Sequence, residues 1–424
     1  MDSGLSSRAQ QRTLAHRAAA PPQAYDSATA VDLSSAQNEL LRPELLAFLK
    51  SIIQDQTASE VFALPASNHG EARLRLALAS FFNAYFHPVH SVKSDHVVVT
   101  ASATDAIESV IQAVCDDGDS VLVPGPSWLA DGFTPMLASR ANVNIIVAQT
   151  PSYNNWDNYL FASLQATYNF SADKKRIKAV LLCNPHNPLS RCYPKKALLE
   201  VMEFCQEHGC HLIVDEIYAL TDLACRPAKA PAFVSALSLT EPLVPEGAVK
   251  VDASRVHVIW SASKLFGLNG LGIGCIISQQ NQPLLSALSH LTTNHATALS
   301  TTYLAHLLVW PQLPTLLHLN TERLSSSYRL LASALTKWNV PFVAPSHGLF
   351  LFARLARHAR CAAQEKAFYD GLARAGVRVG QGPLYKGVEG EFGWARICFA
   401  VEVSVLQGAL ARVERVLAAE EGGG

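Results

Sequence analysis

The stretch that decides the fold runs Val256-His257-Val258-Ile259-Trp260-Ser261-Ala262-Ser263-Lys264 and is followed by glycines at positions 267, 270, 272 and 274. Its first five residues predict a buried strand, and the glycines predict a turn that lets backbone approach a ligand closely. Lysine condenses with aldehydes when burial or a cationic neighbour deprotonates its ammonium group. The two serines can hydrogen-bond a phosphate. Because short motifs of this kind also occur in ordinary loops, the meaning of Lys264 depends on the residues upstream.

Apolar runs alternate with helical patterns from about residue 70 to residue 280. The predicted strands cover 97–100, 120–123, 144–147, 178–183, 211–214, 256–260 and 274–278, with predicted helices at 104–115 and 195–207. Near-continuous apolar strands separated by helices are typical of a mostly parallel sheet with helices on both faces. Open sheets of this kind bind ligands at the carboxyl ends of their strands, where the polar residues of this chain fall.

The pattern changes after about residue 315, where long helical stretches (316–338 and 362–375) alternate with short strands (348–352 and 396–399). The sequence therefore predicts an α/β fold with two domains. The large domain has a mostly parallel sheet sandwiched by helices, and the smaller domain is α+β.

The predicted boundaries place the large domain at 66–315 and the small C-terminal domain at 316–424. Residues 31–65 are expected to pack on the small domain. Residues 1–30 are expected to form a flexible arm, and their arginines leave a transit peptide as the alternative.

The composition excludes several classes of protein. The chain has 424 residues, of which 49% are hydrophobic and 16% charged, with a net charge of -1. This near-neutral balance gives no electrostatic reason to expect nucleic acid or an anionic membrane as a partner. No apolar run approaches the ~18 residues of a membrane-spanning helix. The nine cysteines form no C-x-x-C pair, which favours a reduced, cytoplasmic setting without a structural metal.

Strand ends upstream of Lys264 carry residues that a pyridoxal phosphate site needs. Ala103 and Thr104 follow the 97–100 strand at the start of a helix, where free backbone N–H groups bind phosphate. A simple helix cap by Ser102 or Thr104 is the alternative. Trp128 follows the next strand and can stack on a pyridinium ring, although a lone tryptophan is often ordinary packing.

The later strand ends add polar groups for the ring and for a substrate. Asn187 and Tyr218 can hydrogen-bond a phenolate oxygen, although Asn-Pro pairs are also ordinary turn formers. Asp215 follows a buried strand, and a buried carboxylate is costly unless a cation such as a protonated pyridine nitrogen pairs with it. Arg396 lies in a predicted strand, and its guanidinium matches a carboxylate bidentately.

Together these motifs resemble the class I/II aminotransferases, the fold type I pyridoxal-phosphate enzymes, and in particular the 1-aminocyclopropane-1-carboxylate synthase-like branch. Residues 184–189 resemble the family's N-P-x-N-P-x-G motif, residues 215–218 its D-E-x-Y motif and residues 261–274 its S-x-S-K…G-x-R-x-G motif. Residues 35–40 resemble the branch's L-A-E-N-Q-L motif, and residues 68–70 its Y-H-G motif. The resemblance implies a homodimer that binds pyridoxal 5'-phosphate and acts at Cα of an α-amino acid through an external aldimine.

The resemblance also assigns roles to single residues. Lys264 would be the catalytic lysine, which carries the cofactor as an aldimine and shuttles a proton. The other residues that it implies are Ala103, Thr104, Ser261 and Ser263 around the phosphate, Trp128 on the ring, Asp215 at the pyridine nitrogen, Asn187 and Tyr218 at the phenolate, and Arg396 with Asn187 at the substrate carboxylate. Because the sequence places no second arginine in the site, we expect a substrate with a neutral side chain.

Three positions depart from the family pattern. Gly272 replaces a phosphate-binding arginine, and Asn68 replaces a tyrosine that reaches the partner's phosphate. These changes remove a charge and a hydroxyl from the phosphate site. Gln37 replaces the synthase branch's glutamate, which argues against cyclopropane formation.

The sequence favours an aminotransferase of secondary or amino-acid metabolism. A C–S (β-elimination) lyase, or another synthase-like lyase, is the alternative, because the residues do not determine the step after removal of the Cα proton. A non-catalytic degenerate paralogue is the alternative of another class. The presence of Lys264, Asp215, Asn187, Tyr218 and Arg396 argues against it.

Overall fold

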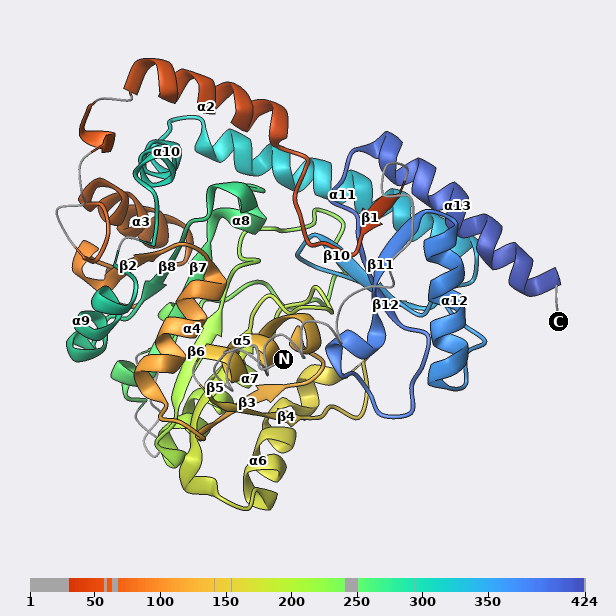
Figure 1. Cartoon of the computed structure of the whole chain (residues 1–424), viewed down its shortest axis with the longest axis horizontal. Coiled ribbons are helices and arrows are strands. Elements are labelled where there is room, and N and C mark those ends of the chain that lie inside the picture. Colours follow the sequence, from red (N-terminus) through yellow and green to blue (C-terminus); the bar gives the residue numbers. More distant parts are fainter. Residues whose placement is uncertain are drawn as a thin grey trace, which may run out of the picture.

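The computed structural model describes residues 30–56, 59–62, 68–140, 142–153, 155–240, 251–293 and 295–422. Two sheets organise the described chain, and they lie side by side in Figure 1. The predicted arm at 1–30 lies outside the described residues, apart from residue 30.

The first sheet has seven strands in the order β2-β8-β7-β6-β5-β3-β4. They are β2 (Val97–Thr100), β3 (Ser120–Pro124), β4 (Asn144–Ala148), β5 (Ile177–Cys183), β6 (His211–Asp215), β7 (Val256–Ser261) and β8 (Gly274–Ile277). Each predicted strand is present, with its ends within one residue of the prediction. Strands β3 to β7 pair in parallel, whereas β8 runs antiparallel to both β2 and β7. The mostly parallel sheet is therefore confirmed.

Apolar side chains on both faces of these strands explain the covering helices. In β6, Ile213 packs in one hydrophobic cluster, and its neighbours Leu212 and Val214 pack in the other. One face contacts α4 (Ala103–Val114), α5 (Thr134–Arg140) and α9 (Gln282–Leu291), and the other contacts α6 (Leu160–Phe170) and α7 (Lys195–His208). Burial on both faces fixes the strands and brings their carboxyl ends to one edge.

The second sheet has five strands in the order β1-β11-β12-β10-β9. They are β1 (Val31–Leu33), β9 (Phe342–Val343), β10 (Phe350–Ala353), β11 (Val377–Gln381) and β12 (Ala395–Cys398). Strand β1 comes from the N-terminal segment and pairs in parallel with β11. The helices of this part are α11 (Leu313–Lys337), α12 (Ala362–Arg374) and α13 (Val403–Gly422), which Figure 1 shows around the sheet. The domain boundaries stay a prediction.

The predicted strand at 348–352 begins two residues too early. Gly348 has a left-handed φ of +88°, and a Cβ there would lie 2.8 Å from the Ser190 hydroxyl oxygen. This turn conformation is incompatible with an extended strand, so pairing with β12 starts at Phe350.

The N-terminal half also contributes α2 (Arg42–Gln56) and α3 (Ala72–Tyr85), and both contact α10 (Ala298–Leu308). Among the described residues, no helix has the length and apolar character needed to cross a membrane.

Candidate active site

The carboxyl ends of the parallel strands, strands β11 and β12 and helix α12 border a cavity of about 900 Å³. Nine of the ten residues predicted for the site line this cavity: Ala103, Thr104, Trp128, Asn187, Asp215, Tyr218, Ser263, Lys264 and Arg396. The loop at 34–37, which follows β1, also lines it. The cavity therefore brings together residues from both sheets.

Lys264 lies on α8 (Ala262–Leu265), a short helix that begins directly after β7. Its Nζ donates to the Ala36 backbone oxygen at 2.7 Å. Burial lowers the pKa of Lys264 to about 8, and the positive charge of Arg396 acts in the same direction. A larger fraction of this amine is therefore neutral near pH 7 than in an exposed lysine, as a nucleophile requires.

Ser261 is the one predicted site residue that the structure does not bring to the cavity. Its fully buried Oγ accepts a hydrogen bond from the Ser263 backbone N–H at 3.1 Å and lies 2.9 Å from the Ile273 backbone oxygen. It therefore caps α8 and braces the turn that carries Lys264. Ser263, two residues on, does line the cavity, and its Oγ lies 2.8 Å from the Ser261 Oγ.

Asp215 ends β6 and is buried at the cavity wall. Burial raises the pKa of this carboxyl group to about 7, although a hydrogen bond from the Ile217 backbone N–H and the charge of Lys264 oppose the shift. Such a group is stabilised as an anion when a cation lies against it. The protonated ring nitrogen of a pyridine would supply that cation.

Arg396 connects the two sheets at the cavity. Its guanidinium donates to the Asn187 side-chain oxygen at 2.9 Å and to the Ser34 backbone oxygen at 2.6 Å. It also lies over the rings of Phe350 and Tyr385, at 4.6 and 5.3 Å from their centroids. Its Nε is buried without a hydrogen-bond partner among the described residues. Nη1 and Nη2 each make one hydrogen bond within the described chain, so each keeps a second N–H for a carboxylate.

The remaining aromatic residues form the cavity wall. Tyr218 packs edge-on against Phe350, and burial holds the pKa of its phenol well above the usual range. Trp128 packs against Phe133, and any side chain at Gly132 would collide with the indole ring. His186, to which the sequence assigned no role, is buried against Trp156 and contributes to packing.

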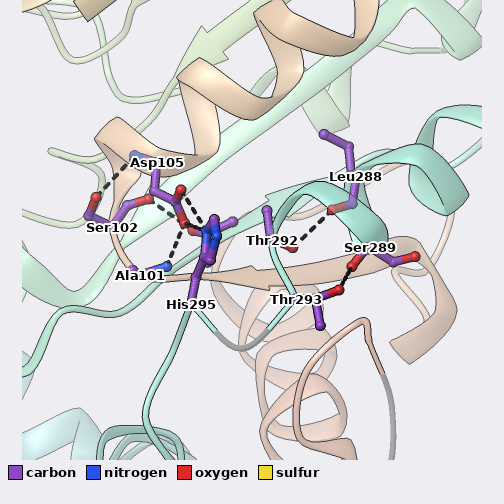
Figure 2. A network of polar contacts seen from close by, with 9 residues as sticks. Ala101, Ser102, Asp105, Leu288, Ser289, Thr292, Thr293 and His295 are labelled. Carbon is purple, nitrogen blue, oxygen red and sulfur yellow. Dashed lines mark hydrogen bonds and ion pairs between the residues drawn. The ribbon is translucent and has the colours of Figure 1, made fainter. Parts of the chain in front are cut away.

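Figure 2 shows the hydrogen bonds that hold the turn before α4 in place. The Ser102 hydroxyl accepts from the Asp105 backbone N–H at 3.0 Å, and the Asp105 carboxylate accepts from the Ala101 N–H at 2.9 Å. His295 contacts the same Asp105 carboxylate, with its Nδ1 3.0 Å from Oδ1. Within the described chain the backbone N–H groups of residues 103 and 104 have no acceptor, and both residues line the cavity. A phosphate would satisfy them.

Gly272 and Asn68 are two of the positions at which the sequence departs from the family pattern. Gly272 adopts a left-handed φ of +56°, and a Cβ there would lie 3.2 Å from the Ala101 backbone oxygen. Asn68 is exposed. The Ser300 hydroxyl next to this turn donates to the Leu271 backbone oxygen of its own chain. The arginines in the described cavity lining are Arg378 on β11 and Arg396 on β12, so neither lies on the turn that precedes α4.

Sequence reasoning missed several residues of the cavity lining. Tyr385, which flanks Arg396, follows a Gly-Pro turn but belongs to no recognisable motif. Cys183 and Arg378 also line the cavity, although neither lies in a pattern that predicts binding. Their positions depend on strand pairing, Cys183 beside Asp215 and Arg378 beside β1.

These residues fit pyridoxal phosphate. The unpaired N–H groups at the start of α4 suit its phosphate, and the buried Asp215 suits its ring nitrogen. Lys264 has the lowered pKa that condensation with its aldehyde requires. Residues for all three parts of the cofactor therefore line the same cavity.

Comparisons with known proteins agree with this arrangement. The family model described as Aminotransferase class I and II matches residues 28–413. A probable aminotransferase of Aspergillus oryzae, aclI, is 36% identical over 91% of this chain and 90% of its own length. The rice 1-aminocyclopropane-1-carboxylate synthase 5 is 30% identical over 84% of this chain and 65% of its own length.

Solved structures show the same fold. The aromatic aminotransferase of Pyrococcus horikoshii superposes with a TM-score of 0.76 at 18% identity, covering 97% of this chain and 99% of that structure. The aspartate aminotransferase of Thermus thermophilus with maleate gives 0.72 at 21% identity, with the same coverage. The predicted fold class is therefore confirmed.

Proposed function

Because the chain belongs to the class I and II aminotransferases, we propose that it binds pyridoxal 5'-phosphate at Lys264 and transfers the amino group of an α-amino acid. The family and its fold depend on this cofactor in general. The observation that carries the proposal is the convergence of three groups in one buried cavity: the Lys264 amine, the Asp215 carboxylate and the Arg396 guanidinium.

Each group has a separate role. When bound, the cofactor supplies an electron sink for negative charge at the substrate Cα. Asp215 holds the ring nitrogen in its protonated form, and Asn187 and Tyr218 hydrogen-bond the phenolate oxygen. The backbone N–H groups of Ala103 and Thr104, with the Ser263 hydroxyl, hold the phosphate, and Trp128 covers the ring.

Lys264 then acts as the base and acid at the substrate. Because its pKa is lowered, enough of the amine is neutral near pH 8 to take a proton from the substrate Cα. The resulting ammonium group can donate this proton again later in the reaction. Arg396 would bind the substrate's α-carboxylate and so orient the substrate Cα toward the Lys264 amine. A buried arginine between two aromatic rings suits this role, because its planar fork is held in one orientation.

We also propose a homodimer. Exposed apolar side chains gather on helices that contact one another: Leu46 and Ile53 on α2, Leu76 on α3 and Leu299 on α10. These helices lie together at one end of the molecule in Figure 1. A second copy of the chain would cover this surface and bring its own Asn68 close to the shared interface. Sedimentation at micromolar concentration tests this, and an active monomer would contradict it.

The reaction is tested with the purified protein, pyridoxal phosphate, a panel of α-amino acids and β-substituted cysteine conjugates, and 2-oxo acid acceptors. We expect paired appearance of a new 2-oxo acid and a new amino acid, which Lys264→Ala abolishes. Release of ammonia with a free thiol, without a new amino acid, would instead identify a C–S lyase. No product with any substrate, despite bound cofactor, would identify a non-catalytic protein.

A further inference from the structure

Helix α4 begins with a buried acidic residue beside the proposed phosphate site. Asp105 is the third residue of this helix, directly after Ala103 and Thr104. Its carboxylate does not cap the N–H groups of those two residues, because Oδ2 accepts from the Ala101 N–H at 2.9 Å instead. The two N–H groups therefore stay available for a phosphate, but a negative charge lies in the same helical turn.

A carboxylate and a phosphate at one helix end repel each other. The positive end of the helix dipole attracts both anions, and like charges within one turn of a partly buried helix destabilise one another. Asp105 is absent from the described lining of the cavity, so its effect on a bound phosphate would come from its charge and from the backbone that it holds. An unpaired Asp105 would therefore weaken phosphate binding.

His295 pairs with Asp105 from the segment between α9 and α10. Its Nδ1 lies 3.0 Å from one carboxylate oxygen and 3.1 Å from the other, and Figure 2 shows the two side chains in contact. This geometry suits an imidazolium paired with a carboxylate. The His295 side chain is 39% exposed, so its ring can take a proton from solvent. Within the described part of the chain, no other basic side chain forms an ion pair with Asp105.

The pair also holds the backbone of the turn. The Ala101 N–H is bound by Asp105, and the Ala101 oxygen lies against Gly272, where a Cβ would be 3.2 Å away. Residue 101 is therefore fixed from two sides, which sets the direction of the helix start that follows it. An asparagine at position 105 would keep an acceptor for the Ala101 N–H and would lose only the charge.

We propose that His295 is a positioning residue for the cofactor: as its imidazolium it neutralises Asp105 and keeps the carboxylate on Ala101, so that the start of α4 can bind a phosphate. The inference rests on the proposed function. It gives His295 no contact with the cofactor, because this residue is not part of the described cavity lining. The pair carries no net charge, so it does not replace the arginine that is absent at position 272.

The experiment compares pyridoxal 5'-phosphate with pyridoxal, which lacks the phosphate, by equilibrium dialysis against the full-length protein. The ratio of the two Kd values isolates the contribution of the phosphate. We expect His295→Gln to weaken binding of pyridoxal 5'-phosphate about tenfold and to leave pyridoxal binding unchanged, because glutamine can donate to Asp105 but has no charge. The double variant Asp105→Asn with His295→Gln should regain the wild-type affinity, since the repelling charge is gone as well.

His318→Gln is the matched control. His318 lies on the exposed surface of α11, where its Nε2 is 3.4 Å from a Glu322 carboxylate oxygen, so this change also removes a histidine from a carboxylate. The control should keep the wild-type ratio.

Three outcomes would overturn the inference. The first is an unchanged ratio in His295→Gln. The second is an equal loss of affinity for both ligands, which a purely structural role would produce. The third is failure of Asp105→Asn to restore phosphate-dependent binding in the double variant. Each would leave the proposed function intact as long as the wild type binds pyridoxal 5'-phosphate, whereas a wild type that binds neither ligand would overturn both.

Discussion

The guanidinium of Arg396 donates to the side-chain oxygen of Asn187 at 2.9 Å, and this bond crosses from the five-stranded sheet to the loop after β5. Asn187 is thus oriented by the same residue that is proposed to bind the substrate. The substrate's α-carboxylate and the cofactor's phenolate oxygen would therefore share one hydrogen-bonded pair, and a change in Arg396 should affect both.

Arg396→Lys should raise KM and lower kcat/KM by about ten- to a hundredfold, since a lysine cannot make the bidentate contact, which is worth about 1.5–3 kcal/mol. Steady-state kinetics with amino acids measures this loss. Amines that lack the carboxylate should be poor substrates of the wild type and should lose little further activity in the variant. Equal rates for amines and amino acids in the wild type would mean that Arg396 is structural.

Lys264→Ala should remove covalent attachment of the cofactor and lower turnover by several orders of magnitude, because the nucleophile and the proton carrier are lost together. Borohydride reduction of the wild type followed by peptide mass spectrometry should find the cofactor on the peptide that contains Lys264. Lys196→Ala, on the exposed surface of α7, is the control and should behave as the wild type. Labelling of another lysine in the wild type would contradict the assignment.

The strands of the large sheet could be predicted because each is a short apolar run, and all except the half-exposed edge strand β4 are buried on both faces. The direction of β8 could not, since four residues from Gly274 to Ile277 carry no signal that separates parallel from antiparallel pairing. For the site, the motifs around Lys264, Asp215 and Arg396 were sufficient to identify residues that meet in one cavity.

Two parts of the site depend on information that spacing does not carry. Ser261 and Ser263 both flank Lys264 in the motif, but the helical turn after β7 buries Ser261 away from the cavity and leaves Ser263 at the cavity wall. Arg378 lies in an ordinary strand pattern, and only the pairing of β11 with β1 and β12 brings it to the cavity. Long-range pairing of this kind is not encoded in any local pattern.

Gly272→Arg tests whether the phosphate site lacks a cation. The left-handed φ of +56° at Gly272 makes any side chain there cost about 1–2 kcal/mol of stability. Gly272→Ala carries this cost without the charge and is the matched control. We expect both variants to unfold at lower denaturant concentration than the wild type. In equilibrium dialysis, Gly272→Arg should bind the cofactor more tightly than Gly272→Ala does. Equal affinities would show that another group already neutralises the phosphate.

His257 should make the protein sensitive to acid. It is fully buried on β7, with its Nε2 2.9 Å from His211 Nδ1 and its Nδ1 3.0 Å from the Ser278 hydroxyl oxygen. Burial lowers the pKa of His257 to about 3, and the neighbouring His211 adds to the effect. Because the unfolded chain takes up this proton near pH 6.5 and the folded chain does not, the stability contributed by neutral His257 is present above pH 6.5. It is lost as the pH falls further.

Between pH 7 and pH 5, His257 alone should therefore remove about 2 kcal/mol from the free energy of unfolding. Urea titrations of the wild type and of His257→Gln at both pH values measure this difference. The variant should be less stable at pH 7, because its side chain no longer fits the buried pair, but it should lose about 2 kcal/mol less on acidification. The same acid loss in both proteins would mean that other groups carry the pH dependence.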